Sequence, residues 1–498
     1  MIPYIVQVLG IENYGIYGLL NAFVAPMGLI GLGTAPAIIR GVASHRDDRL
    51  SNMVQMYVQV GLALSLVIGI IGGLFIVAVG PPIFLKFFSK SSIAVTDLYK
   101  CFLLVGIQWL CNQINGTWSA AVAGLQEYRF TAIGQTTQNI LLTGFGVFAL
   151  WLGFGLVGYV FASTLTSILM IIYWMGAVAR LIGKHALLPA FEPKIAKLTI
   201  SFGAWFSLAQ IGKLLGADSQ RYIVGLILGA SSVGIFNIAH RIMSTLYGIN
   251  GKILEVLFPH FSSQTSLPTE IKLRNLLITT GGCSLFSVST LSPLVAIACP
   301  ILSLWISPQV GSHGYVLLQL LCLGGLFISV SGPVYFFLLS EGKSRITATI
   351  ALFVGVTMTL VSLLVTPKFG LVGLGIAFTT AGIMYFILYA TALYHLSKGS
   401  SCNLMKSYLV YSLVPIATSA LIYYIASSNI HASSWLSIVI IYSALSLSSL
   451  FLGCLSLQML DYILNIKLNP LKIVKNNLMG FAIPYINSSW KFFKHFNG

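Results

Sequence analysis

Charge is what this sequence has least of. Only 8% of its 498 residues are Asp, Glu, Lys or Arg, whereas 57% are hydrophobic. Soluble domains carry about a quarter charged residues, so this composition excludes a soluble enzyme and indicates a polytopic membrane protein. Apolar stretches of more than about 18 residues recur along the chain, as membrane-spanning helices require.

The chain also lacks clustered cysteines. Its 7 cysteines are scattered, with no CxxC pair and no His/Cys cluster at metal-ligand spacing, so we expect no metal and no cofactor. The sequence has no nucleophile triad, phosphate loop or nucleotide-binding motif, which argues against an enzyme. The net charge of +16 would suit nucleic acid, but no soluble stretch is long enough for such a site, and we expect no nucleic-acid partner.

What the sequence does contain is a series of apolar segments. A short one, 1–9, is too short to span a bilayer. Thirteen longer ones are predicted spans: 14–39, 53–79, 101–122, 131–153, 155–178, 198–228, 233–258, 276–306, 315–339, 346–365, 371–394, 408–426 and 435–457.

Two motifs recur in the same order along the chain. Residues 9–17 read LG-x4-G-I followed by an aromatic residue, and 228–236 repeat that pattern. Phe-Gly-Leu-Val-Gly stands at 154–158 and again, verbatim, at 369–373. Two matches at nearly equal offsets indicate an internal duplication. We therefore predict an all-α polytopic membrane protein with two six-helix lobes related by a parallel repeat, followed by two C-terminal helices.

The duplication also sets the expected boundaries. A long apolar helix precedes the motif in the second copy, whereas the first copy has only a short stub, so we expect about 20 residues of helix 1 to be missing. The alternative is a genuine thirteen-span protein. The predicted parts are an N-terminal lobe 1–180 with helix 1 incomplete, a cytoplasmic linker 181–197, a C-terminal lobe 198–395, two additional helices 396–457 and a basic cytoplasmic tail 458–498.

Lys and Arg are concentrated on one side of the predicted membrane. With helix 1 counted as whole, the loops after even-numbered spans and the tail hold most of them. Cytoplasmic loops are enriched in these residues, so we place these loops and both termini in the cytoplasm. The linker 181–197 lies either on the cytoplasmic membrane interface or in solvent. The opposite loops hold only Lys86, Lys90, Lys100 and Lys368.

One predicted helix pair, spans 7 and 8, is an exception to the shortage of charge. An isolated cation at a bilayer centre costs about 2.5 to 3.5 kcal/mol, so such residues persist with a partner or a task. The pair turns near residues 229–232, which sets Arg221 and Arg241 at similar depth. Lys213 and Lys252 continue the same faces. The pair can therefore present a ladder of cations.

Such a ladder predicts an anion-binding cavity. Arg gives bidentate hydrogen bonds to phosphate oxygens, and low-dielectric walls strengthen the attraction, so a pyrophosphate headgroup would be bound. The alternative is that Asp218 with Arg221, and Lys252 with Glu255, are self-neutralising pairs that only hold the helices together. Three residues are expected to support the cavity or couple it to an H⁺ or Na⁺ gradient: Asp218, His240 and Glu255.

A neutral polar stripe lies in the first predicted lobe. Amides in apolar helices hydrogen-bond either to a ligand or to a neighbouring helix. They could contact sugars, and both readings stay open. The candidate sugar contacts are Gln108, Asn112, Asn115 and Gln135.

These motifs together resemble a known family. LG-x-x-x-Y-G opens a helix at 9–15, Gly-Leu-Gly follows at 31–33, and Asp218 precedes a second LG-x-x-x-x-G at 228–234. With this order of motifs the chain is similar to the polysaccharide/O-antigen flippases of the multidrug/oligosaccharidyl-lipid/polysaccharide exporter superfamily. The apparently truncated first helix is its departure from that pattern.

The resemblance implies a function. It implies a flippase that translocates undecaprenyl-pyrophosphate-linked oligosaccharide across the bacterial inner membrane by alternating access, surrounded by membrane lipids and partnered by a glycan polymerase and a chain-length regulator. One alternative is a cation-coupled multidrug exporter of the same fold, which would be expected to carry cavity carboxylates. Another is a membrane glycan polymerase, which would be expected to expose a large outer loop.

Overall fold

The computed structural model is helical throughout the part of the chain that it describes. No strand is present among those residues, and the predicted all-α class is confirmed. The structure describes residues 2–24, 27, 34–45, 52–87, 93–201, 216, 219–262, 268–396, 401–427 and 434–463.

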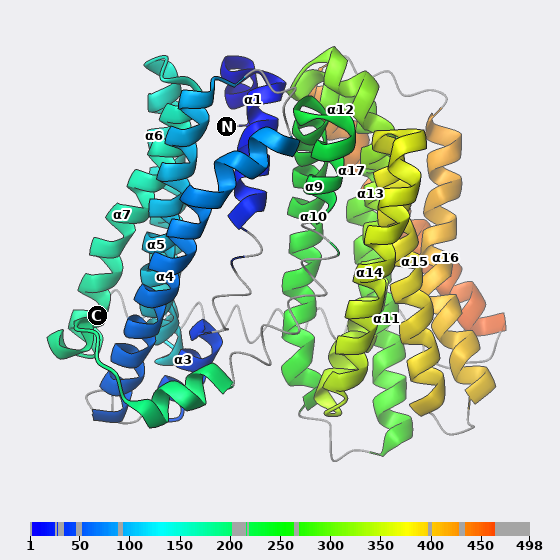
Figure 1. The fold of residues 1–498 in the computed structure, drawn as a ribbon. Coiled ribbons are helices and arrows are strands. Elements are labelled where there is room, and N and C mark those ends of the chain that lie inside the picture. The colour runs from blue at the N-terminus through cyan, green and yellow to red at the C-terminus, as the bar shows by residue number, and fades with distance from the viewer. Residues whose placement is uncertain are drawn as a thin grey trace, which may run out of the picture. The chain divides into compact units, whose positions relative to one another are not determined.

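Most predicted spans coincide with one long helix (Figure 1). By length and hydropathy, seven described helices can cross a membrane: α4, α7, α11, α13, α14, α15 and α17. In chain order the elements are α1 (Ile2–Val24), α3 (Thr34–Ala43), α4 (Asn52–Phe87), α5 (Val95–Gly124), α6 (Tyr128–Trp151), α7 (Gly155–Leu181), the 3-10 helix η1 (Lys184–Leu187), α9 (Ser219–Leu228), α10 (Ala230–Ser262), α11 (Thr269–Ala296), α12 (Ala298–Trp305), α13 (Pro308–Ser340), α14 (Ser344–Phe369), α15 (Leu371–Leu396), α16 (Ser401–Ser427) and α17 (Trp435–Ile463).

The predicted span 276–306 forms two helices rather than one. Ile297 separates α11 from α12, with φ −100° and ψ 14°. Pro293 lies in the last turn of α11 and Pro300 in the first turn of α12. Proline has no N–H to donate to the preceding turn and its ring crowds that turn. Two prolines this close therefore interrupt the helix despite its continuous apolar composition.

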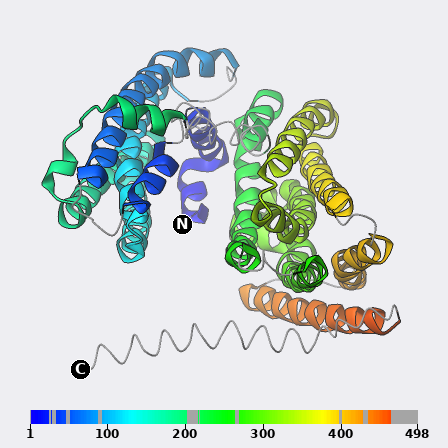
Figure 2. The ribbon, with the colours of Figure 1, turned by 90° about the horizontal axis from the view of Figure 1, so that it is seen from below.

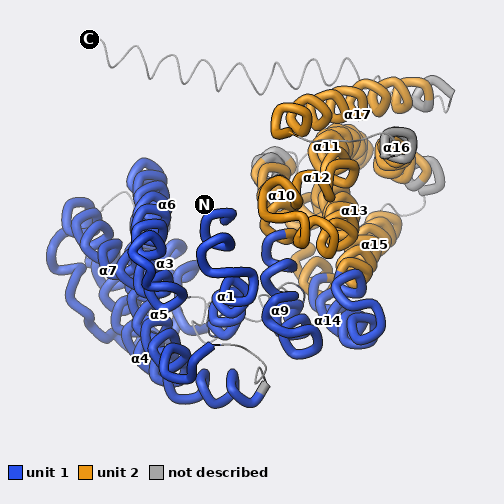
Figure 3. Tube along the Cα trace, turned by 90° about the horizontal axis from the view of Figure 1, so that it is seen from above, with its two compact units in different colours: residues 1–238, 351–374 blue, residues 239–350, 375–498 orange. Residues whose placement is uncertain are grey.

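The chain divides into two compact units (Figure 3). Unit 1 comprises residues 1–238 and 351–374, and unit 2 comprises 239–350 and 375–498. The helices α10, α14 and α15 therefore contribute residues to both units. These units are defined by contacts and do not test the predicted lobe boundaries, which stay a prediction.

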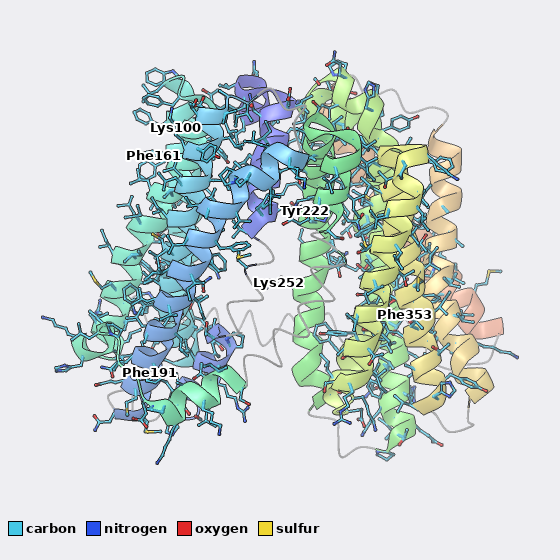
Figure 4. All side chains as sticks on the ribbon, in the orientation of Figure 1. Lys100, Phe161, Phe191, Tyr222, Lys252 and Phe353 are labelled. Atoms are coloured by element: carbon cyan, nitrogen blue, oxygen red, sulfur yellow. The ribbon has the colours of Figure 1, made fainter. Side chains whose placement is uncertain are left out.

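In unit 1 the long helix α5 packs against α4 and α7. The linker after α7 is attached to the start of α4, because the Gln59 side chain donates a 2.8 Å hydrogen bond to the carbonyl of His185. Gln55 donates similarly to Ile182, at 3.4 Å. Phe191, labelled in Figure 4, remains 67% exposed on this linker. Whether the linker meets a membrane surface stays a prediction.

In unit 2 the helix α11 packs against α13, α16 and α17. The α17 helix, orange in Figure 2, also packs on α16. Lys272, in the first turn of α11, forms an ion pair with Glu341, which follows the end of α13. Lys272 Nζ lies 2.9 Å from Glu341 Oε1, and the lysine side chain is largely buried. The two C-terminal helices are thus packed on the second unit.

The duplicated motif adopts the same backbone conformation in both copies. Gly10, inside α1, has φ 80°, and Gly229, between α9 and α10, has φ 85°. These values fall in the left-handed region, which residues with a Cβ rarely adopt. The two glycines occupy equivalent positions in the motif. Each copy therefore turns the chain at its glycine and then begins a helix.

Those two helices then meet at a second pair of equivalent glycines. A methyl group on Gly15 of α1 would overlap the carbonyl oxygen of Ala230, and one on Gly234 of α10 would overlap the carbonyl oxygen of Ile11. Ile11 and Ala230 are themselves equivalent in the two copies. The contact is therefore reciprocal, and backbones approach this closely only where side chains are absent. We call it the glycine crossing (Gly15, Gly234).

We predict that Gly234→Ala loosens the glycine crossing. The added methyl must displace the backbone of α1, and overpacking of this kind costs about 1–3 kcal/mol. The thermal unfolding midpoint of the purified protein in detergent should fall. Gly248→Ala, on the same helix but with nothing near its Cβ, should leave the midpoint unchanged or slightly raised. Equal midpoints for the two variants would contradict the crossing.

Candidate functional site

The residues of the predicted cationic site that the structure describes lie on the hairpin of α9 and α10. Arg221 on α9 donates a hydrogen bond from Nε to Oδ1 of Asn237 on α10, at 3.1 Å. Both residues stand at equal sequence distance from Gly229, as expected for two antiparallel helices joined there. The bond aligns the guanidinium of Arg221 along the hairpin.

Asn237 is held on its other side by α1. A Cβ on Gly18 would overlap the Nδ2 atom of Asn237, so this amide fills the space that the missing side chain leaves. Asn237 lies one helical turn before Arg241 on the continuous helix α10. Asn237 is not among the predicted site residues. It is as far from Gly229 in the sequence as Arg221 is, and this symmetry is the signal that could have identified it.

The neighbour of Arg221 ties α9 to α1 as well. The hydroxyl of Tyr222 donates a hydrogen bond to the carbonyl oxygen of Ala22, and its ring meets that of Phe23 edge-on, with centroids 5.9 Å apart. Phe23 also packs against Phe102, at 5.6 Å. Tyr222 is labelled in Figure 4. This aromatic packing fixes the rotation of α9, and with it the direction in which Arg221 leaves the helix.

Arg241 and Lys252 lie about three turns apart on one exposed face of α10. Thr245, Gly248 and Ile249 occupy the positions between them and are exposed too. Among the described residues, the Arg241 guanidinium has no hydrogen bond or ion pair. Lys252 is labelled in Figure 4. We call this surface the basic face of α10 (Arg241, Thr245, Gly248, Ile249, Lys252).

The opposite face of α10 is packed inside unit 2. Met243 is only 3% exposed, and its Sδ lies 3.5 Å from where a Cβ on Gly325 of α13 would stand. Asn250 donates a 3.4 Å hydrogen bond to Thr290 of α11. His240 is half-buried between the two faces. Packing on one side therefore leaves the basic face as the side of α10 turned away from the core.

Three predicted site residues lie outside the described part of the chain. Lys213 and Asp218 belong to residues that the structure does not describe, and Glu255 lies within α10 but without a described side chain. The pairing of Asp218 with Arg221 and of Glu255 with Lys252 therefore stays a prediction. No group of three His, Cys, Asp or Glu residues that could hold a metal occurs among the described residues.

The neutral stripe of the first lobe is divided. Asn115 is buried and donates a 2.8 Å hydrogen bond to the carbonyl of Ser167 on α7. Gln108 accepts a 3.2 Å hydrogen bond from the Ser163 hydroxyl of the same helix. These two amides therefore join α5 to α7. Asn112 and Gln135 are exposed, and a sugar contact for either stays a prediction.

The fold is shared with solved structures of membrane transporters. The chain aligns with a solved structure of the lipid II flippase MurJ at a TM-score of 0.68, covering 92% of this chain and 98% of that one at 14% identity. It aligns with an inward-facing multidrug resistance MATE family transporter at 0.66, covering 80% and 94% at 15% identity. At these identities the likeness establishes the fold.

The family follows from the sequence comparison. Residues 1–264 match the family described as "Polysaccharide biosynthesis protein", and the chain belongs to that family. It is also 23% identical over 388 residues to the "Putative O-antigen transporter" of Shigella flexneri, covering 76% of this chain and 89% of that protein. The resemblance drawn from the short motifs is thereby confirmed.

We predict that Asn237→Leu destabilises the hairpin. It removes the acceptor of the Arg221 Nε–H in a part-buried position, which costs about 1–3 kcal/mol. The unfolding midpoint in detergent should fall, whereas Asn237→Asp, which keeps an acceptor oxygen, should stay close to wild type. If the two variants unfold alike, the hydrogen bond does not hold the hairpin.

Proposed function

We propose that the protein is a flippase that moves undecaprenyl-pyrophosphate-linked oligosaccharide across the bacterial inner membrane, for surface polysaccharide or O-antigen biosynthesis. The basic face of α10 is the observation that carries the proposal. A helix in an apolar protein does not present Arg241 and Lys252 to hydrocarbon, because charges there are costly. A hydrated cavity that receives an anionic headgroup accounts for both cations.

The chemistry of the cations suits a pyrophosphate. Arginine binds phosphate oxygens in a bidentate manner, and lysine acts as a mobile point charge. Arg221 is directed by Asn237, whereas the Arg241 side chain makes no bond within the described residues. One guanidinium is thus preset and the other is available to a ligand. We propose Lys213 as a further member of the cavity, with Asp218, His240 and Glu255 supporting it or coupling it to an ion gradient.

Transport by alternating access fits the duplication. In transporters built from repeats, the substrate lies between the repeats, and rocking of one against the other exposes it to each side in turn. We propose that the lobes 1–180 and 198–395 act in this way, while the polyprenyl tail stays in lipid. The glycine crossing joins α1 of the first repeat to α10 of the second, at a point where the two backbones are in close contact.

The cation-coupled drug exporter remains the second candidate. The MATE fold likeness favours it, but a cationic drug calls for carboxylates, and only Asp218 and Glu255 among the 11 acidic residues are predicted inside the membrane. The polymerase alternative has less support because the matched family and structural neighbours are named as transporters or biosynthesis proteins.

A glycan polymerase and a chain-length regulator are proposed as partners, and the C-terminus is proposed to be cytoplasmic.

We predict that Arg221→Gln with Arg241→Gln abolishes export in cells lacking the chromosomal gene. Losing two charge-assisted bonds to phosphate should lower surface polysaccharide at least about tenfold. Lipid-linked repeat units should accumulate inside. Surface glycan is measured by immunoblot, and lipid-linked units by mass spectrometry of membrane extracts.

The matched control is Arg129→Gln with Arg345→Gln, which removes two exposed arginines at the starts of α6 and α14 and should leave export unchanged. Normal surface glycan in the Arg221/Arg241 variant would refute the proposal that these two arginines bind the pyrophosphate. Normal glycan with altered drug sensitivity in the gene deletion would favour the exporter.

A further inference from the structure

Four tyrosines from three helices gather inside unit 2. Tyr385 and Tyr389 stand one turn apart on α15 with stacked rings, whose centroids are 6.0 Å apart and whose planes differ by 9°. Tyr335 of α13 meets the Tyr389 ring edge-on at 6.2 Å. Tyr247 of α10 lies close to Tyr335 and Tyr385. We call this group the tyrosine cluster (Tyr247, Tyr335, Tyr385, Tyr389).

The cluster is neither a sealed core nor an open surface. Tyr389 is buried, at 3% exposed, whereas Tyr247, Tyr335 and Tyr385 are half-buried. A tyrosine in an apolar setting normally gives its hydroxyl a hydrogen-bond partner. Within the described residues, no hydrogen bond is made by any of the four hydroxyls. Half-buried tyrosine rings and hydroxyls without a hydrogen bond among the described residues therefore occur together.

We propose that the tyrosine cluster binds the sugar portion of the substrate. A pyranose ring has an apolar C–H face and a polar edge of hydroxyls, and both are matched by tyrosine, which offers an apolar ring with a hydroxyl at its tip. A polyprenyl tail would need no hydroxyls, and an anionic group would need a cation among the rings. The inference rests on the proposed function and adds a binding site to it.

The position of Tyr247 connects the cluster with the phosphate site. On α10 it lies between Arg241 and Lys252 in sequence, but about a third of a turn around the helix from their face. One helix thus presents cations along one face and a tyrosine on the adjoining flank. A substrate whose pyrophosphate meets the basic face of α10 would extend its first sugars toward the cluster.

The test measures the affinity of the full-length protein in lipid nanodiscs for two probes by native mass spectrometry. One probe is bare undecaprenyl pyrophosphate. The other is the same lipid carrying its glycan, extracted from the bacterial strain whose gene encodes the protein. The variant Tyr247→Phe with Tyr335→Phe and Tyr385→Phe keeps all rings and removes three hydroxyls. Tyr385→Leu removes one stacked ring. Tyr315→Phe, on α13 but 37% exposed near its start, is the control.

The triple variant should bind the glycan-bearing lipid about tenfold more weakly, because each lost hydrogen bond is modest but the losses accumulate. Tyr385→Leu should weaken it severalfold. Binding of bare undecaprenyl pyrophosphate should be unchanged in both, and the control should match wild type with either probe. Unfolding midpoints verify that the variants are folded.

Two outcomes would overturn the proposal. One is unchanged affinity of the triple variant for the glycan-bearing lipid, and the other is an equal loss for both probes, which would assign the cluster to the lipid or to packing. Failure of the proposed function is distinguishable: wild-type protein would then bind neither probe more tightly than the phosphatidylglycerol of the nanodisc.

Discussion

The close backbone contact between α1 and α10 is the constraint on which the hairpin of α9 and α10 depends. It exists because Gly15 and Gly234 lack side chains at the point where the helices cross. Once the crossing is made, Asn237 falls beside Gly18 and the hydroxyl of Tyr222 reaches the carbonyl of Ala22. These contacts orient α9 and α10, so the direction of the Arg221 side chain follows from a contact made by glycines one to two turns away.

The shortage of charge gives the few cations their meaning. In a soluble protein an exposed arginine and lysine on one helix face would be unremarkable, since most such residues are solvated. In a chain with 8% charged residues and long apolar helices, the same two residues are exceptional, and the proposed anion site is based on them. The neutral polar side chains differ between the two units. In unit 1 the amides of Asn115 and Gln108 join one helix to another, whereas in unit 2 the tyrosine cluster has hydroxyls without a hydrogen bond among the described residues.

Much of the fold could be predicted from two features of the sequence. Long apolar segments indicate membrane-spanning helices, and the repeated motifs indicate two lobes of the same fold. Most of the spans and the equivalence of Gly10 with Gly229 follow from the pattern alone, whereas the predicted spans 14–39 and 198–228 lie partly outside the described residues. The break at Ile297 arises from Pro293 and Pro300, which interrupt the helix although the segment is apolar throughout. Asn237 and the tyrosine cluster could not be found this way, because their neighbours come from other helices: Gly18 lies far upstream of Asn237, and Tyr335 is separated from Tyr389 by an entire helix.

The reciprocity of the glycine crossing bears on the origin of the chain. Gly15 contacts Ala230, and Gly234 contacts Ile11, which is the exchange that a two-fold axis produces between identical subunits. A surface that recognises its own copy can assemble two separate polypeptides as readily as two halves of one. The nine-residue stretch 9–17 and its copy 228–236 therefore meet as the same stretch of two identical half-length proteins would meet in a homodimer.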